Sequence, residues 1–230
     1  MIFNDNKQNK TAFTLAEVLI TLGIIGVVAA LTIPGLITEH QKRATVTKLQ
    51  RAISVINQAY RMSFDDVGEP ISAYEIKSDE YFKTYWAPYI KALTYCSKPQ
   101  DCGYNSNGPF SHPNGQKSPT ALISETMRTT FYTADGFLYI IFVGGGTSKP
   151  GETQALNWVW VDINGGTKPN EFGKDVFFFI RQTDGKGVQP YGQSLTDAKI
   201  NADCSKTGTG QYCAEKIRRN GWKISKDYPW

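Results

Sequence analysis

The sequence predicts an α+β fold in which one long N-terminal helix packs on an antiparallel β-sheet head. Three features predict this class. The chain has an apolar run at residues 13–33, then apolar residues at helical spacing over residues 46–60, then a two-residue periodicity within residues 129–181. A helical region followed by consecutive strands is typical of α+β domains.

The apolar run predicts a membrane-spanning helix over residues 13–34. Residues 13–33 contain a single charged side chain, that of Glu17. Roughly 20 apolar residues in a helix span the hydrocarbon core of a bilayer, and a helix satisfies its own backbone polar groups in lipid. A carboxylate in such a segment costs about 2.5 kcal/mol or more, so Glu17 indicates a function that needs a partner.

Pro34 and Gly35 follow this run and weaken the helix, because proline removes a backbone hydrogen bond and crowds the preceding turn. We expect a kink there. The helix then continues as an amphipathic stalk over residues 35–64, since an apolar stripe recurs at spacings of three and four residues. The stripe, which should pack on the head, consists of Val46, Leu49, Ile53, Ile56 and Tyr60.

Residues 65–230 are predicted to form the globular head, a length that is sufficient for one domain with its own core. Gly68 and Pro70 end the stalk helix. The aromatic residues between positions 74 and 93 have partly helical spacing. This spacing predicts one or two short helices that cap the head and contribute aromatic side chains to its core.

Four strands are predicted in the second half of the chain, and their consecutive order favours an antiparallel meander. The first two flank a hairpin turn at residues 134–136. A last short helix is expected near residues 214–219, with Gly221 in the position of a C-cap. The predicted strands span residues 129–133, 137–143, 158–163 and 176–181.

The four cysteines form two local pairs, Cys96 with Cys102 and Cys204 with Cys213. An even number of cysteines after an export-type N-terminus predicts disulfides in an oxidising compartment. Four cysteines allow three pairings, and local pairing is expected because each pair closes a short loop of small and polar residues. A four-thiolate zinc site is the alternative, but neither pair has the C-x2-C spacing usual for zinc ribbons.

The stretch Ala12-Phe13-Thr14-Leu15-Ala16-Glu17 follows a short polar leader and precedes the apolar helix that ends near Pro34. This arrangement resembles the N-terminus of type IV pilins and pseudopilins. The resemblance implies that a prepilin peptidase removes residues 1–12 by cutting between Ala12 and Phe13, and methylates the new amine. It also implies that Glu17 neutralises the N-terminal amine of a neighbouring subunit in a filament. One departure is Ala12, where the family usually has glycine.

The resemblance further implies the partners and the location of the protein. The partners would be the prepilin peptidase, the inner membrane and other pilin or pseudopilin subunits. The head would be extracytoplasmic, and the subunit would end in a pilus, a pseudopilus or at the cell surface. Basic residues at positions 42–51, after the span, oppose this topology by the positive-inside rule. The cysteine pairs and the resemblance outweigh that objection.

Residues 161–177 resemble the loop between the late strands of pseudopilin-like heads, some of which bind calcium. Calcium takes six to eight oxygen ligands, and the glycines of this loop allow backbone carbonyls to turn inward. An ordinary turn is the favoured alternative, since the spacing lacks that of an EF-hand. No cofactor is therefore certain. The side chains that could hold calcium are those of Asp162, Asn164, Glu171 and Asp175.

The sequence thus favours a pilin-like structural subunit and not an enzyme. The two histidines, His40 and His112, belong to no catalytic motif. A net charge of +4 is too small to indicate nucleic-acid binding. A cleaved secretory signal, with its cut after Ala30, would need a shorter apolar run. The main alternative is a membrane-anchored extracytoplasmic binding or adhesion protein, which would keep Met1 and have no use for Glu17.

Overall fold

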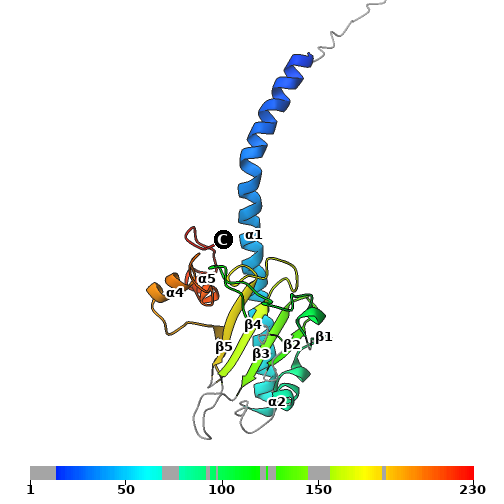
Figure 1. The fold of residues 1–230 in the computed structure, drawn as a ribbon, viewed down its shortest axis with the longest axis vertical. Coiled ribbons are helices and arrows are strands. Elements are labelled where there is room, and N and C mark those ends of the chain that lie inside the picture. The colour runs from blue at the N-terminus through cyan, green and yellow to red at the C-terminus, as the bar shows by residue number, and fades with distance from the viewer. Residues whose placement is uncertain are drawn as a thin grey trace, which may run out of the picture. The chain divides into compact units, whose positions relative to one another are not determined.

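The computed structural model describes residues 14–68, 78–91, 94–96, 98–119, 123, 128–144, 156–182 and 185–230. The chain divides into two compact units, Met1–Gln41 and Lys42–Trp230. Figure 1 shows the helices and strands of each unit. The boundary after Gln41 falls inside the segment for which the sequence predicts the stalk.

One α-helix, α1 (Leu15–Val67), contains both the apolar run and the predicted stalk. It is 53 residues long and includes Pro34 without an interruption of the helix. The kink expected at Pro34 and Gly35 stays a prediction. The helix ends three residues later than expected, and the N–H of Gly68, which has a positive φ of 82°, donates to the carbonyl of Phe64.

In the second unit, α1 packs on the sheet through the stripe that the sequence predicts. Val46, Leu49, Ile56 and Tyr60 are buried, and Ile53 is half-buried. Their spacing places them on one side of the helix, so the amphipathic prediction is confirmed. Smaller buried residues complete this face, namely Ala52, Ala59 and Ser63.

The head contains a six-stranded antiparallel sheet whose strands are adjacent in sequence order (Figure 1). The four predicted strands are confirmed to within two residues. The two edge strands were not predicted. One has only two residues, and the other ends in proline, a residue tolerated mainly at sheet edges. The strands are β1 (Thr94–Tyr95), β2 (Arg128–Tyr132), β3 (Leu138–Gly144), β4 (Leu156–Asp162), β5 (Val176–Gln182) and β6 (Gly187–Pro190).

Alternate residues of the strands enter two hydrophobic clusters, one on each face of the sheet. Tyr139, Val161 and Phe179 belong to the cluster that includes α1. This cluster also contains Tyr81, Phe82 and Trp86, from α2 (Ser78–Tyr85) and the turn before η1 (Ala87–Tyr89). The prediction of short helices with core aromatics is therefore confirmed. The opposite face is covered by Cys102, Tyr104 and Phe110, near η2 (Pro99–Cys102).

Two short helices follow the sheet, α4 (Asp197–Asp203) and α5 (Cys213–Arg219). The second confirms the predicted helix, and Gly221 follows its end with a positive φ of 66°. The N–H of Gly221 donates to Arg218 and that of Trp222 donates to Ile217. These two hydrogen bonds form a Schellman motif at the end of the helix. Glycine is the preferred residue at the left-handed position of this motif.

Candidate functional site

The first turn of α1 is closed by a reciprocal pair of hydrogen bonds between Thr14 and Glu17. The Glu17 carboxylate accepts from the backbone N–H and from the hydroxyl of Thr14, both at 2.8 Å. The backbone N–H of Glu17 donates to the Thr14 hydroxyl at 3.3 Å. These contacts form a capping box, in which the third helical residue caps the helix start. Glu17 is thus held beside the point at which the chain enters the helix.

The residues that follow are apolar and unburied. None of residues 14–41 is buried, and large side chains such as Leu19, Ile24 and Leu31 are well exposed. By length and composition, α1 contains a segment that could cross a membrane. An apolar helix of this kind needs either lipid or other helices around it. Ala12 and Phe13, the predicted cleavage residues, lie outside the described residues.

At the end of β4, Asp162 is 1% exposed and its carboxylate is fully hydrogen-bonded. It accepts from the hydroxyl of Tyr104 at 2.8 Å and from the backbone N–H of Asn164 at 3.1 Å. Tyr104 is 58 residues away in the chain, on the loop that covers this face of the sheet. The contact therefore fixes the start of the loop after β4 to the loop that follows η2.

Asp175 organises the other end of the same loop. It is 4% exposed, and it accepts from the backbone N–H groups of Asn170 at 2.8 Å and Glu171 at 2.6 Å. The side-chain amide of Asn164 donates to it at 3.3 Å. The donors to Asp175 all come from the loop itself, whereas Asp162 also accepts from Tyr104 outside it.

This geometry supports the interpretation of residues 162–175 as a structural turn. Glu171 pairs with Lys174 at 3.2 Å. Across the described ranges, no group of three or more histidine, cysteine, aspartate or glutamate side chains is arranged to hold a metal ion. Calcium binding by Asp162, Asn164, Glu171 and Asp175 stays a prediction.

The two aspartates are destabilised as anions. Burial raises the pKa of Asp162 well above its ordinary value of 3.8, and the neighbouring Asp175 carboxylate raises it further. Burial also raises the pKa of Asp175, although hydrogen bonds from Glu171 and Asn170 oppose the rise. A raised carboxyl pKa in the folded chain means that the folded state holds its proton more strongly than the unfolded state.

We therefore expect the free energy of unfolding to fall as the pH rises from about 4 through the raised pKa values. Well below pH 3.8, the ordinary pKa of aspartate, both carboxyls are protonated in the folded and the unfolded chain. As the pH rises above this value, the carboxyls ionise first in the unfolded chain, and this ionisation stabilises the unfolded state. Chemical denaturation at a series of pH values should show a shallower fall for Asp162→Asn. Asp65→Asn, which changes an exposed carboxyl of α1, is the control. Equal slopes for the wild type and Asp162→Asn would contradict this assignment.

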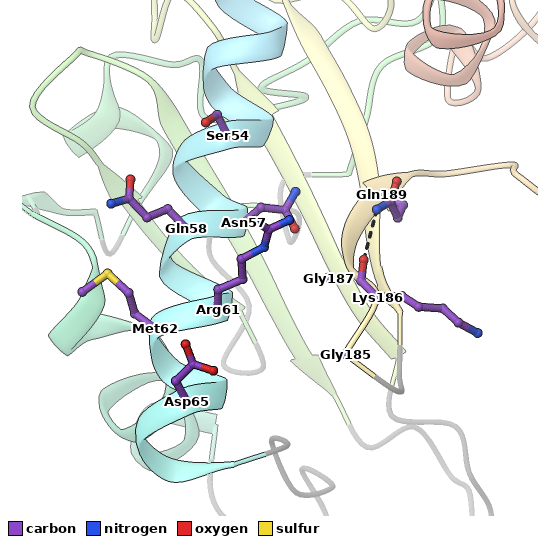
Figure 2. Close-up of a pocket in the computed structure, with 10 residues that line it drawn as sticks. All are labelled: Ser54, Asn57, Gln58, Arg61, Met62, Asp65, Gly185, Lys186, Gly187 and Gln189. Atoms are coloured by element: carbon purple, nitrogen blue, oxygen red, sulfur yellow. Dashed lines mark hydrogen bonds between the residues drawn. The ribbon is translucent and has the colours of Figure 1, made fainter.

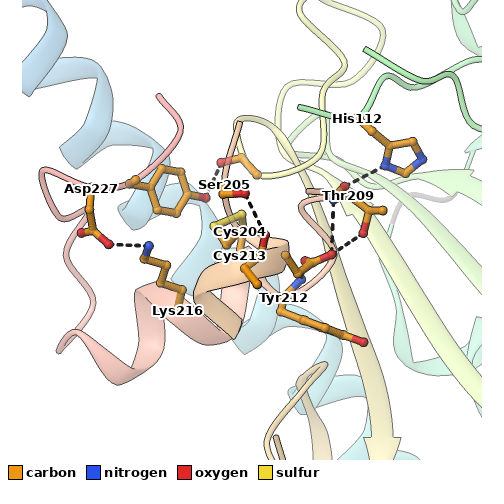
Figure 3. Close-up of a disulfide and its surroundings, with 12 residues drawn as sticks. His112, Cys204, Ser205, Thr209, Tyr212, Cys213, Lys216 and Asp227 are labelled. Atoms are coloured by element: carbon orange, nitrogen blue, oxygen red, sulfur yellow. Dashed lines mark hydrogen bonds and ion pairs between the residues drawn. A yellow bond between two sulfur atoms is a disulfide. The ribbon is translucent and has the colours of Figure 1, made fainter. Parts of the chain in front are cut away.

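Both disulfides join the local pairs, so the predicted connectivity is confirmed and the zinc alternative is wrong. The Cα atoms are 5.7 Å apart in Cys96–Cys102 and 5.0 Å apart in Cys204–Cys213. The second disulfide is completely buried in the core. Figure 3 shows it among side chains from the loop and the tail around it.

The C-terminal tail packs around this disulfide and is held by polar contacts. Lys216 donates to Asp227 at 2.6 Å, a contact that lowers the pKa of Asp227 to about 2. The buried Tyr228 hydroxyl donates to the carbonyl of Gly173. A Cβ atom at Gly173 would lie 2.9 Å from the sulfur of Cys213. The disulfide, the tail and the loop of Asp175 therefore form one packed assembly.

His112 makes contacts that stabilise the fold. Its Nδ1 lies 2.7 Å from the carbonyl of Thr209, and its ring stacks on that of Phe172 with centroids 4.7 Å apart. The histidine thus links the loop before β2 to the loop between Cys204 and Cys213 (Figure 3). These contacts explain His112 without a catalytic role.

Asn57 of α1 caps the edge strand β6. Its amide nitrogen donates to the carbonyl of Val188 and its amide oxygen accepts from the N–H of the same residue, both at 2.8 Å. Figure 2 shows Asn57 turned toward Gly187 beside a pocket of about 510 Å³. Asn57 thus takes the place of a further strand at this position of the sheet edge.

Asn57→Ala should lower the free energy of unfolding by about 2 kcal/mol, because it leaves the N–H and C=O of the buried Val188 without partners. Gln58→Ala, an exposed neighbour on the same helix, should change it by less than about 0.5 kcal/mol. Chemical denaturation of the two variants and the wild type measures the difference. Equal effects of the two substitutions would show that the cap does not stabilise the head.

Comparison with known protein families adds to this geometry. A model of the prokaryotic N-terminal methylation motif matches residues 7–33. The chain is type IV pilin-like. The motif and the long apolar N-terminal helix together support this statement. A second model, of a family of unknown function (DUF6613), matches residues 164–230. No curated protein and no solved structure matches the chain.

The DUF6613 match covers the loop that ends at Asp175, the strands β5 and β6, the helices α4 and α5 and the second disulfide. These are the parts that pack around Cys204–Cys213. The pilin-like N-terminus is therefore joined to a head whose C-terminal part matches a family with no assigned function.

Three site contacts were missed in the sequence analysis. The Thr14-x-x-Glu17 spacing is the signature of a capping box and could have been recognised. Tyr104 has no local signal, because its partner Asp162 is 58 residues away. Asn57 likewise meets Val188 across 131 residues, and an asparagine within a helical pattern is not by itself informative.

Proposed function

We propose that this protein is a structural subunit of a type IV pilus or of a type II secretion-type pseudopilus. A prepilin peptidase removes residues 1–12 and methylates Phe13, and the subunit assembles through its N-terminal helix. The observation that carries the proposal is the unburied apolar helix with one carboxylate, Glu17, in its first turn. The role is structural, without catalysis.

The physics of Glu17 supports assembly over simple anchoring. Its hydrogen bonds come from Thr14, which is neutral. An anionic carboxylate in lipid or in a helix bundle needs a cation. The methylated amine at Phe13 of a neighbouring subunit supplies this cation. A helix that served only as a membrane anchor would have no use for the carboxylate.

The location follows from the same arrangement. The N-terminal helix inserts into the inner membrane and the head lies on the extracytoplasmic side, where its two disulfides persist. The partners are the prepilin peptidase and other pilin or pseudopilin subunits. The subunit then moves from the membrane into a pilus or pseudopilus.

Assembly is tested by expression of the full chain with the prepilin peptidase and assembly machinery of a pilus or of a secretion system. After mechanical shearing, we expect the processed chain in the fraction of released filaments. The same cells without the peptidase should release none. A chain that stays wholly in the membrane with Met1 intact would instead support a membrane-anchored extracytoplasmic binding or adhesion protein.

A further inference from the structure

The part of α1 between Glu39 and Asp65 carries only positive charge. Between Glu39 and Asp65 the chain has five basic residues and no acidic one. Arg51 is paired with Asp135 at 3.0 Å. Arg61 comes ten residues after it. The remaining three, which lie within seven residues at the start of the second unit, form what we call the basic segment: Lys42, Arg43 and Lys48.

Two of these side chains have no ionic partner in the part of the chain that the structure describes. Arg43 and Lys48 are exposed, and neither takes part in an ion pair there. Lys42 is half-buried. The exposed charges are therefore available to an anionic partner outside the subunit.

The angular distribution of the basic segment indicates what kind of partner it fits. An α-helix turns by about 100° per residue, so Arg43 and Lys48 lie about 100° and 240° around the axis from Lys42. The buried Val46 and Leu49 lie within about 40° of Lys42. Lys42 is therefore on the side of the helix that faces the head, and Arg43 and Lys48 are on the outward side. Arg43 and Lys48 are about 140° apart on this outward side, a spread that suits the many phosphates of a headgroup layer better than a single acidic side chain.

The position in the chain favours the same partner. Lys42 follows Ile37, the last strongly exposed large apolar residue of the N-terminal run, by five residues. The headgroup layer beyond the hydrocarbon core is roughly 5–7 Å thick on each side of a bilayer. The basic segment extends for about 9 Å along the helix.

We propose that Lys42, Arg43 and Lys48 bind the phosphate groups of anionic phospholipids at the membrane surface from which the head emerges. This inference rests on the proposed function, because it requires the N-terminal helix to be anchored in a bilayer. It also gives a role to basic residues that oppose export of the head by the positive-inside rule. They would hold the exported subunit at the membrane surface before assembly.

The test uses the full chain in lipid nanodiscs that contain equal amounts of phosphatidylglycerol and phosphatidylcholine. Native mass spectrometry of the released protein counts the lipids that stay bound. We expect the wild type to retain phosphatidylglycerol over phosphatidylcholine by about tenfold, and K42Q/R43Q/K48Q to lose most of this preference. R61Q/K199Q/K206Q removes three exposed cations elsewhere and should keep it.

The outcomes separate the two proposals. A wild-type chain that enters the discs without a preference for the anionic lipid contradicts this inference alone, as does an unchanged preference in K42Q/R43Q/K48Q. Loss of assembly in that variant with an unchanged lipid preference would point to an acidic protein partner and also overturn the inference. A wild-type chain that does not enter the discs contradicts membrane anchoring, and with it the proposed function.

Discussion

Replacement of Glu17 by alanine or glutamine should leave the subunit processed but lower the yield of filaments by about a hundredfold or more. In the proposed filament, Glu17 is the counter-ion of a neighbouring N-terminal amine. Removal of one member of a buried ion pair leaves the other charge unpaired, at about 3–5 kcal/mol. Since about 1.4 kcal/mol corresponds to a tenfold change in an equilibrium constant, the loss is between about two and four orders of magnitude.

The capping box allows the charge of Glu17 to be separated from its role in the helix. Glutamine also serves at the third position of a capping box, so Glu17→Gln removes the charge and keeps the cap. Thr14→Ala removes the cap, at about 1 kcal/mol, and keeps the charge. The yield of sheared filaments, normalised to processed subunit, should fall for Glu17→Gln and change little for Thr14→Ala. Wild-type yield from Glu17→Gln would contradict the proposed pairing.

Loss of the Cys204–Cys213 disulfide should lower the free energy of unfolding of the head by about 3 kcal/mol. A loop of this length, with the cysteines nine positions apart, gives an entropic effect of that size in the unfolded chain. The two sulfurs also fill a fully buried position beside Gly173 and α5. The Cys204→Ala and Cys213→Ala double variant, unfolded with denaturant under non-reducing conditions, measures the loss.

The matched control is the other disulfide. The Cys96→Ala and Cys102→Ala variant opens a shorter loop, with the cysteines six positions apart, and should lose about 2 kcal/mol. Cys96 and Cys102 are also buried, but less completely, at 7% and 3% exposed against 0% for Cys204 and Cys213. A larger loss for this variant than for Cys204–Cys213 would show that the C-terminal assembly does not depend on its disulfide.

The parts of the fold that the sequence predicts have local signals. The stripe from Val46 to Tyr60 repeats with the helical period, and β2 to β5 are strands of seven residues or fewer with β-branched and aromatic side chains. The cysteine pairs are close in sequence, so the local pairing was the simplest and is the one formed. In each case neighbouring residues carry enough information to define the element.

The features that were missed depend on contacts between distant residues. β6 contains Gly187 and Pro190, which disfavour strands, and it forms because β5 and Asn57 supply its hydrogen bonds. β1 has only two residues and exists through its pairing with β2. In the loop after β4, spacing alone could not show that Asp162 accepts a hydrogen bond from Tyr104, which is 58 residues away.

The central claim is that this chain is a processed pilin-like subunit, and the N-terminal sequence and mass of the mature protein from membranes test it most directly. The account predicts a chain that begins at N-methylated Phe13, with residues 1–12 removed. A chain that retains Met1, or one that begins after Ala30, would contradict it.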